Sequence, residues 1–344
     1  MLPNGRRLGA HLPLGPGMVR AADRAGVIGA SAIQVFADNP TAWHRRETPP
    51  DELPAFRARL TALDIAPLSI HAPYLVNLAG PDTSTWDRSV AVLANELRVG
   101  RDWGASFVNV HVGSHRGTGP DAGAVRLAAG LRMVLDTLDA GDVRGGRDRP
   151  GGSGGSAPGP LVVLENGAGG GFGLGSTIEE LALIDGAMAG AGIDPERVGF
   201  CLDTAHLWGA GYPIGGAAGV DALLAAFDAS IGLGRLRMVH LNDSRSEAGS
   251  KTDRHEHIGA GRIGHAGLRR FLDHPGLGHV AYFLETPGMD DGYDAVNLGR
   301  VLDIAAGRPL ADLPPEAFET RGPAGRSAPA GSGHGASDGP EGGP

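Results

Sequence analysis

The sequence predicts an α/β fold of the (β/α)8 type, the TIM barrel, in which strands and helices alternate and the parallel strands close into a ring. One observation behind this prediction is that short apolar runs alternate with longer amphipathic segments along the chain. Another is that most of these runs end on imidazole or carboxylate side chains. The eight runs are LGAHLPLG, AIQVFADN, PLSIHAPY, FVNVHVGS, LVVLENGA, VGFCLDTAH, RMVHLNDS and AYFLETPG.

The segments between the runs have helical spacing. In residues 82–100, DTSTWDRSVAVLANELRVG, the side chains of Val90, Leu93 and Leu97 fall on one face of a helix. Eight strand–helix units in about 300 residues fit a closed parallel barrel. An open doubly wound sheet is the alternative architecture.

Two segments differ from the rest in composition. Residues 141–160 and 321–344 consist mainly of glycine, proline, serine and charged residues, with too little apolar area to offset the entropy of the chain. We expect both to be disordered. Residues 1–320 are then predicted to form a single catalytic barrel domain, with the insertion at 141–160 between the fourth helix and the fifth strand, on the face opposite to the strands' carboxyl ends.

Composition excludes several classes of protein. The formal net charge of -9 argues against a protein that coats nucleic acid generally. Lys251 is the only lysine among 30 basic residues, so Schiff-base chemistry has one candidate. Because we find no apolar run of about 18 residues and no secretory signal, we expect a cytoplasmic protein without a membrane partner. Cys201, in VGFCLD, is expected to be a buried strand residue.

The polar residues that end the apolar runs are predicted to meet. In a barrel the carboxyl ends of the strands form the active face. A buried carboxylate or imidazole is costly unless something compensates it, and divalent metal ions do so. Six strand ends are involved, at His71, His111, Glu165, Asp203, His240 and Glu285.

Two close pairs strengthen the prediction of a metal site. Asp203 and His206 lie three residues apart in LDTAH, and Asp253 and His255 lie two apart in DRH, so each pair could reach one ion. Imidazole and carboxylate without thiolate suit zinc or manganese, and five histidines among nine ligands favour zinc.

The remaining histidines are not predicted to be ligands. His115 and His257 lie close to ligands in the sequence and either support them or are unrelated to them. We expect His334 in the tail, and we expect the others on the surface or on helices: His44, His265, His274 and His279.

These residues lie in motifs similar to those of a known family. The strings LDTAH, HLNDS and DRHEHIGAGRIG occur in order with GAH, FADNPTAW, HAPYLVNLA, NVHVGSH, LENGAG and LETP. Together they resemble the endonuclease IV family of apurinic/apyrimidinic endonucleases, over residues 8 to 306. The resemblance implies a xylose isomerase-like TIM barrel. It also implies hydrolysis of DNA on the 5′ side of abasic sites, which leaves a 3′ hydroxyl, and trimming of blocked 3′ ends during base excision repair.

The resemblance further implies a cofactor and partners. The family's cluster holds three zinc ions, and manganese is compatible with one of the sites. Glu285 and Glu165 would be the catalytic carboxylates, with Glu285 and the two nearest ions activating water. The partner would be damaged double-stranded DNA. The protein would be a monomer and would act on this DNA at the nucleoid. The ligands would be His71 and His111 for one ion with Glu165 bridging to the second, Asp203, His240 and Glu285 for the second, and His206, Asp253 and His255 for the third.

The same resemblance suggests how DNA is held. We expect contacts from five residues: Tyr74, Leu75, Asn39, Trp43 and Arg254. The loop after the second strand departs from the family, in which an arginine often enters the damaged duplex. This chain has Pro-Thr-Ala at 40–42 instead, and its arginines follow only at 45 and 46.

The chemistry supports the assignment independently of the motifs. A phosphodiester is anionic and resists neutral water, whereas bound zinc lowers the pKa of water to about 7. Three dications outweigh the charge of four carboxylates. The metal site of an acidic protein would therefore be positively charged and could bind phosphate.

Two alternatives remain at this point. Sugar isomerases and epimerases share this barrel and also use metals, although the third set of ligands has no task in their reaction. A non-catalytic protein that binds abasic DNA would use the same surface.

Overall fold

The predicted barrel is confirmed. The computed structural model describes residues 1–145 and 159–319, and within them eight parallel strands close into a ring in the order β1-β10-β7-β6-β5-β4-β3-β2. These are the eight predicted apolar runs. The strands are β1 (Leu8–His11), β2 (Ala32–Val35), β3 (Leu68–His71), β4 (Phe107–His111), β5 (Leu161–Glu165), β6 (Val198–Asp203), β7 (Leu236–His240) and β10 (Ala281–Leu284). A small antiparallel pair, β8 (Asp243–Ser244) and β9 (His255–Glu256), follows β7.

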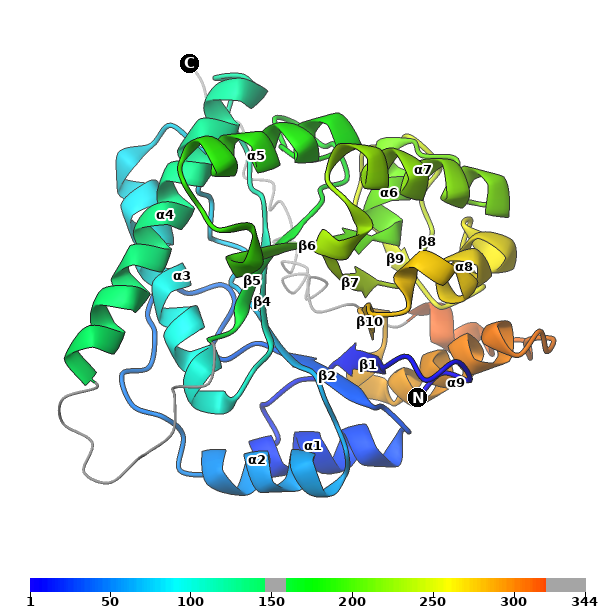
Figure 1. Cartoon of the computed structure of the whole chain (residues 1–344). Coiled ribbons are helices and arrows are strands. Elements are labelled where there is room, and N and C mark those ends of the chain that lie inside the picture. The colour runs from blue at the N-terminus through cyan, green and yellow to red at the C-terminus, as the bar shows by residue number, and fades with distance from the viewer. Residues whose placement is uncertain (146–158, 320–344) are drawn as a thin grey trace, which may run out of the picture.

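Helices surround the ring on its outside (Figure 1). They bury apolar faces on the strands, as parallel strands that are covered on both sides require. The α-helices are α1 (Met18–Val27), α2 (Leu53–Ala62), α3 (Thr83–Trp103), α4 (Pro120–Gly145), α5 (Ile178–Gly190), α6 (Thr204–Ala210), α7 (Ala217–Ser230), α8 (Gly264–Asp273) and α9 (Tyr293–Ala305). Short 3-10 helices are η1 (Pro195–Arg197), η2 (Leu233–Arg235), η3 (Pro275–Leu277), η4 (Met289–Asp291) and η5 (Pro315–Glu319). In the described ranges, no helix has the length and apolarity that crossing a membrane requires.

Helix α3 shows how the sequence sets these elements. Asp82 caps its first turn by accepting a hydrogen bond from the Thr85 backbone N–H at 2.7 Å. Gly104 ends it in the left-handed conformation, with φ at 74°. The predicted face is buried, because Val90, Leu93 and Leu97 all lie in the core. The loop before this helix is attached to it, because the Asn77 backbone N–H donates to Ser89 Oγ at 2.9 Å.

The interior of the barrel is filled separately from the layer between strands and helices. Its six buried hydrophobic side chains are those of Ala32, Val163, Cys201, Met238, Ala281 and Phe283. Cys201 is fully buried, as predicted, and burial raises the pKa of its thiol to about 12. The ring is thus a packed core that supports its mouth, with no pore through it.

One predicted disordered segment begins later than expected. Helix α4 continues to Gly145, so residues 141–145 are helical, and the prediction was wrong there. Residues 141–145, GDVRG, contain only two glycines, and a helix that is already formed can extend through them at low cost. Helix α4 ends, and β5 begins, at the amino end of the barrel, away from the predicted active face. The remainder of that segment and the predicted tail at 321–344 lie outside the described residues.

Replacing Phe283 by alanine tests the barrel interior. We expect Phe283→Ala to lower the free energy of unfolding by about 3–5 kcal/mol, because it leaves a cavity in the closed ring. Urea unfolding followed by circular dichroism measures the change. Phe172→Ala is the matched control, because its ring is 57% exposed, and it should cost no more than about 0.5 kcal/mol. Equal losses in the two variants would contradict this account of the core.

Candidate metal centre

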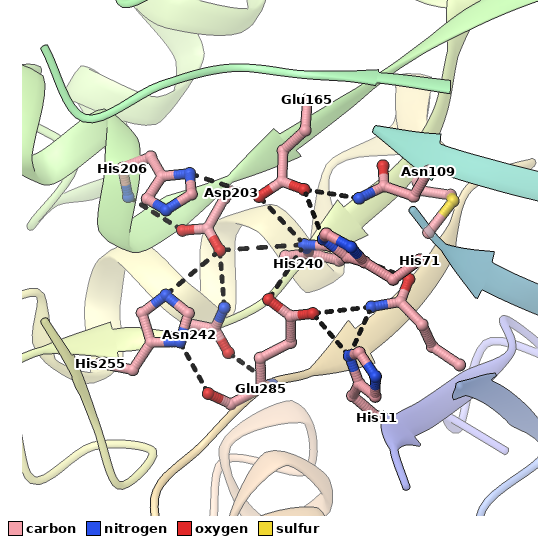
Figure 2. A network of polar contacts seen from close by, with 12 residues as sticks. His11, His71, Asn109, Glu165, Asp203, His206, His240, Asn242, His255 and Glu285 are labelled. Carbon is pink, nitrogen blue, oxygen red and sulfur yellow. Dashed lines mark hydrogen bonds and ion pairs between the residues drawn. The ribbon is translucent and has the colours of Figure 1, made fainter. Parts of the chain in front are cut away.

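Strand register brings the polar strand ends together. His111 of β4 is paired with Glu165 of β5, and Asp203 of β6 with His240 of β7. Phe283 of β10 is also paired with His240, which puts Glu285 one step beyond the end of that strand beside the same residue. Neighbouring parallel strands lie about 4.8 Å apart, so adjacent strand ends can share one ion. Figure 2 shows the side chains of Glu165, Asp203, His240 and Glu285 converging from different strands.

The nine predicted ligands lie in one connected cluster. In each group below, the candidate ligand atoms lie within 4.8 Å of one another. Asp253 completes the cluster, with its carboxylate oxygens 3.3 Å from His206 Nε2 and 3.0 Å from His255 Nε2. Glu165 and Asp203 each belong to two groups, which links the three. The groups are His71, His111 and Glu165; Glu165, Asp203, His240 and Glu285; and Asp203, His206 and His255.

The histidine rings have their orientation set by the backbone. Three of them direct Nδ1 at a main-chain carbonyl oxygen and therefore hold a hydrogen on that nitrogen. Their Nε2 atoms are then unprotonated in the neutral ring and face carboxylates. Such an arrangement is typical of histidines that bind metals. The three bonds are His71 Nδ1 to Ala72 O (2.7 Å), His206 Nδ1 to Asn166 O (2.9 Å) and His255 Nδ1 to Glu285 O (2.6 Å).

His240 has the opposite orientation. Its Nε2 donates to the side-chain oxygen of Gln34 at 3.1 Å, which leaves Nδ1 without a hydrogen when the ring is neutral. This Nδ1 lies 3.3 Å from Glu165 Oε1 and 3.4 Å from Glu285 Oε2, and all three residues are largely buried. A lone pair facing two carboxylate oxygens is repulsive unless a cation lies between them.

Buried polar atoms without partners are concentrated in this cluster. Among the described residues they include Glu165 Oε1, His240 Nδ1 and His255 Nε2, which are buried and make no hydrogen bond. Leaving such atoms unsatisfied costs about 1–3 kcal/mol each. The three atoms are nitrogens or oxygens that can donate an electron pair to a metal ion, and they belong to the groups described above. The residues present therefore fit bound divalent metal ions such as zinc.

The charges of the cluster are strongly coupled. Burial alone would raise the pKa of Glu165, but the His111 and His240 imidazoles outweigh it and hold the pKa well below its usual range. Burial opposes the charged form of His255 as well, yet the carboxylates of Asp203 and Asp253 raise its pKa to about 9. In the metal-free protein, protons on imidazoles thus balance the carboxylates. A metal ion would displace these protons.

A ring of polar side chains around the ligands escaped sequence reasoning. Asn109, Asn242 and His11 each contact a ligand carboxylate (Figure 2), and Gln34 does the same. The strings NVH, HLND and GAH, in which a polar residue stands on the inner face near a strand end, could have indicated three of them. The contacts are Asn109 Nδ2 to Glu165 Oε2 (2.5 Å), Asn242 Nδ2 to Asp203 Oδ2 (2.7 Å), Gln34 Nε2 to Glu285 Oε1 (2.7 Å) and His11 Nδ1 to Glu285 Oε1 (3.0 Å).

The two histidines whose role was open hold loops. His115 Nδ1 accepts hydrogen bonds from the backbone N–H groups of Gly117 and Gly119. His257 is fully buried, and its Nε2 donates to the carbonyl oxygen of Ala317, which attaches the segment after α9 to the barrel. These contacts account for both residues as structural.

The residues expected to contact DNA have different surroundings. Tyr74 is 57% exposed, and its ring centroid lies 6.1 Å from that of His111, at the edge of the mouth. Arg254 is exposed beside Asp253, and Asn39 is exposed on the loop after β2. Leu75 is half-buried, and so is Trp43, which packs under the Arg88 guanidinium at 4.7 Å. Their contact with DNA stays a prediction.

An eight-stranded parallel barrel with clustered imidazoles and carboxylates at its mouth defines a class, the metal-dependent TIM-barrel enzymes. A family model described as xylose isomerase-like TIM barrel matches residues 22–303. The chain is 38% identical to the probable endonuclease 4 of Methanoculleus marisnigri over 299 residues, 87% of this chain and 98% of that protein. It is 36% identical to the probable endonuclease 4 of Halothermothrix orenii over 86% of this chain and 99% of that protein.

Solved structures agree. Endonuclease IV from Thermus thermophilus has a TM-score of 0.71 and 34% identity, and the match covers 88% of this chain and 99% of that chain. A D-tagatose 3-epimerase-like protein has a TM-score of 0.60 at 15% identity, covering 88% and 97%, and so shares the fold alone. The chain belongs to the endonuclease IV family of phosphodiester-cleaving hydrolases, as its motifs predicted.

Gln34 provides a test of the polar ring. We expect Gln34→Leu to weaken zinc binding by about 10- to 100-fold, because Glu285 and His240 both lose the amide that orients them. Competition titration with a chromophoric chelator measures the affinity. Ser69→Ala removes the hydrogen bond from Ser69 Oγ to Gln34 and a weak one to Met238 Sδ, leaves the amide itself in place and should have a much smaller effect. Unchanged zinc affinity in Gln34→Leu would show that the amide does not orient these ligands.

Metal binding should release protons. Because His255 has a pKa of about 9 in the metal-free protein, it is protonated at pH 7 and must lose this proton to bind a metal. Apparent zinc affinity should therefore rise as the pH increases from 7 to 9. Calorimetry in buffers of different ionisation enthalpy counts the protons released. Binding without proton release at pH 7 would contradict the charges described here.

Proposed function

We propose that this protein is a zinc-dependent endonuclease that hydrolyses DNA on the 5′ side of abasic sites, leaves a 3′ hydroxyl and trims blocked 3′ ends. The observation that carries the proposal is the linkage of three ligand groups through Glu165 and Asp203, in a chain of the endonuclease IV family. A scissile phosphate has an attacking and a leaving oxygen, and linked metal sites suit this pair of charges.

The ligand assignment follows the clusters. His71 and His111 would bind one ion, with Glu165 bridging to a second held by Asp203, His240 and Glu285. His206, Asp253 and His255 would bind a third, and Asp203 is close enough to bridge to it. We propose zinc at all three, with manganese compatible with one. When bound, these ions lower the pKa of water to about 7 and stabilise charge on the phosphate oxygens.

Glu285 and Glu165 are the proposed catalytic carboxylates. Glu165 is fully buried, whereas the Glu285 side chain is 16% exposed and so reaches the mouth. Burial by itself would raise the pKa of Glu285, but His240, His11 and His71 hold it well below its usual range. Glu285 is therefore ionised and can orient water only by accepting its hydrogen. Hydrogen bonds from Gln34 and His11 fix the carboxylate in this position.

The proposed substrate is duplex DNA containing an abasic site. Tyr74 and Leu75 on one loop, Asn39 and Trp43 on another and Arg254 on a third are the proposed contacts. The protein's acidic balance, -9 overall, is compatible with this substrate because the metal cluster supplies a local positive charge. We propose a monomer that acts in the cytoplasm at the nucleoid.

The competing functions have less support. Sugar epimerases share the barrel, but the third group of ligands has no task in the isomerisation of sugars. A protein that only binds abasic DNA would not need all nine ligand side chains, which are present here. Metal analysis that finds one ion per chain, with turnover of sugars, would favour the first alternative. Tight binding of abasic DNA without strand scission would favour the second.

Glu285→Gln tests the catalytic assignment. We expect this change to lower the rate of incision of a duplex with one abasic analogue by at least about 100-fold, because an amide cannot replace the ionised carboxylate. Zinc should remain bound, since the other ligands are intact, and plasma emission measures its content. Glu196→Gln, at a side chain 79% exposed, is the control and should cleave normally. Undiminished cleavage by Glu285→Gln would refute the role of this residue.

A further inference from the structure

The loop between β2 and α2 is closed from within by one of its own side chains. Arg45 directs its guanidinium back along the loop, where Nη1 donates to the carbonyl oxygen of Asn39 at 3.1 Å and Nη2 to that of Ala42 at 2.5 Å. Asn39 and Thr41 are exposed on the outer side of the same loop. The fixed fork of an arginine thus sets the shape of residues 39–45.

Glu96 supports this arginine from a different element. It lies on α3, and its Oε1 is 3.4 Å from Arg45 Nε, with side chains only 2% and 7% exposed. Burial raises the pKa of Glu96 to about 7, although Arg45 opposes the rise. Glu96 Oε2 and Arg45 Nε make no hydrogen bond within the described residues. Replacing both members of such a desolvated pair by apolar residues is often neutral, whereas removing one member leaves the other as an uncompensated buried charge.

The same helix holds the loop at a second point. Arg88 of α3 covers the Trp43 ring at 4.7 Å. Helix α3 begins directly after the loop that carries Tyr74 and Leu75. The loops after β2 and β3, which hold four of the five proposed DNA contacts, are therefore fixed to one another through α3.

We propose that the Arg45–Glu96 pair is a positioning latch, which holds residues 39–43 rigid beside the Tyr74 loop so that both meet the duplex flanking the lesion. The latch rests on the proposed function, because it acts on the binding of DNA. Arg45 is a positioning residue, and its guanidinium is engaged inside the protein and does not reach DNA. Arg46 is likewise paired, with Asp38 at 3.4 Å. Residues 40–42 are Pro-Thr-Ala, so this loop has no arginine there to insert into the duplex. It would contact DNA through its fixed shape instead.

The test compares two substrates that differ in their need for the loop. Glu96→Gln keeps the size of the side chain and removes its charge. We expect KM for an abasic duplex to rise about tenfold with kcat unchanged. In the variant the loop is mobile in the free protein, and the cost of ordering it when DNA binds weakens binding. Hydrolysis of bis(p-nitrophenyl) phosphate, which is too small to reach the loop, should stay at the wild-type rate and shows that the variant is folded. Asp87→Asn, which removes an exposed carboxylate from the same helix, is the matched control and should behave as wild type.

A double-mutant cycle shows whether the two residues act as one unit. Arg45→Gln should raise KM by a similar factor, and the double variant should be no worse than either single one. Hydrogen exchange should show faster exchange over residues 39–46 in each variant and not in Asp87→Asn. Wild-type KM and wild-type exchange in Glu96→Gln would overturn the latch while incision continues. Failure of the wild-type protein itself to cleave or bind the abasic duplex would instead overturn the proposed function, and the role of the latch in DNA binding with it.

Discussion

The mouth of the barrel depends on one electrostatic constraint, the close confinement of four carboxylates and five imidazoles, most of which are buried. Hydrogen bonds to carbonyl and amide oxygens fix which ring nitrogen is protonated, so bare nitrogens such as His240 Nδ1 face carboxylate oxygens. Only protons or metal cations make that arrangement stable. The surrounding structure keeps the ligands in place in either case, because Glu165 and Glu285 are held by neutral donors, the amides of Asn109 and Gln34. Preorganisation of this kind lowers the cost of ordering the site when ions bind.

The barrel converts a simple sequence rule into this geometry. Because every strand points the same way, the residue that ends each strand meets the residues that end its neighbours, and the pairing of His111 with Glu165 and of Asp203 with His240 is the direct result. The strands themselves carry the packed interior, including Phe283 and Met238, and this rigid base fixes the distances above it. The more variable loops then determine which substrate reaches the metals.

Sequence patterns were sufficient for the strands and for the strand-end residues, since apolar runs and the polar residues after them are local features. They were insufficient for Gln34, which lies within a strand and whose importance comes from Glu285 and His240, far away in the chain. Glu96 escaped for a related reason, because a glutamate on an amphipathic helix is normally solvated and only the fold shows it to be buried against Arg45. The end of α4 was misplaced because glycine content alone does not locate where a helix stops.

The chemistry of the donor atoms has a consequence for the conditions that this protein can withstand. The cluster binds through imidazole nitrogen and carboxylate oxygen, and the chain's one sulfhydryl, Cys201, is sealed inside the barrel with its pKa raised to about 12. Peroxides attack thiolates, and centres that hold metals through cysteine lose them as the sulfur is oxidised. Here the inner sulfur is neutral and out of reach, and the metal-binding atoms are not sulfur at all. The centre is thereby suited to remain intact under oxidative stress.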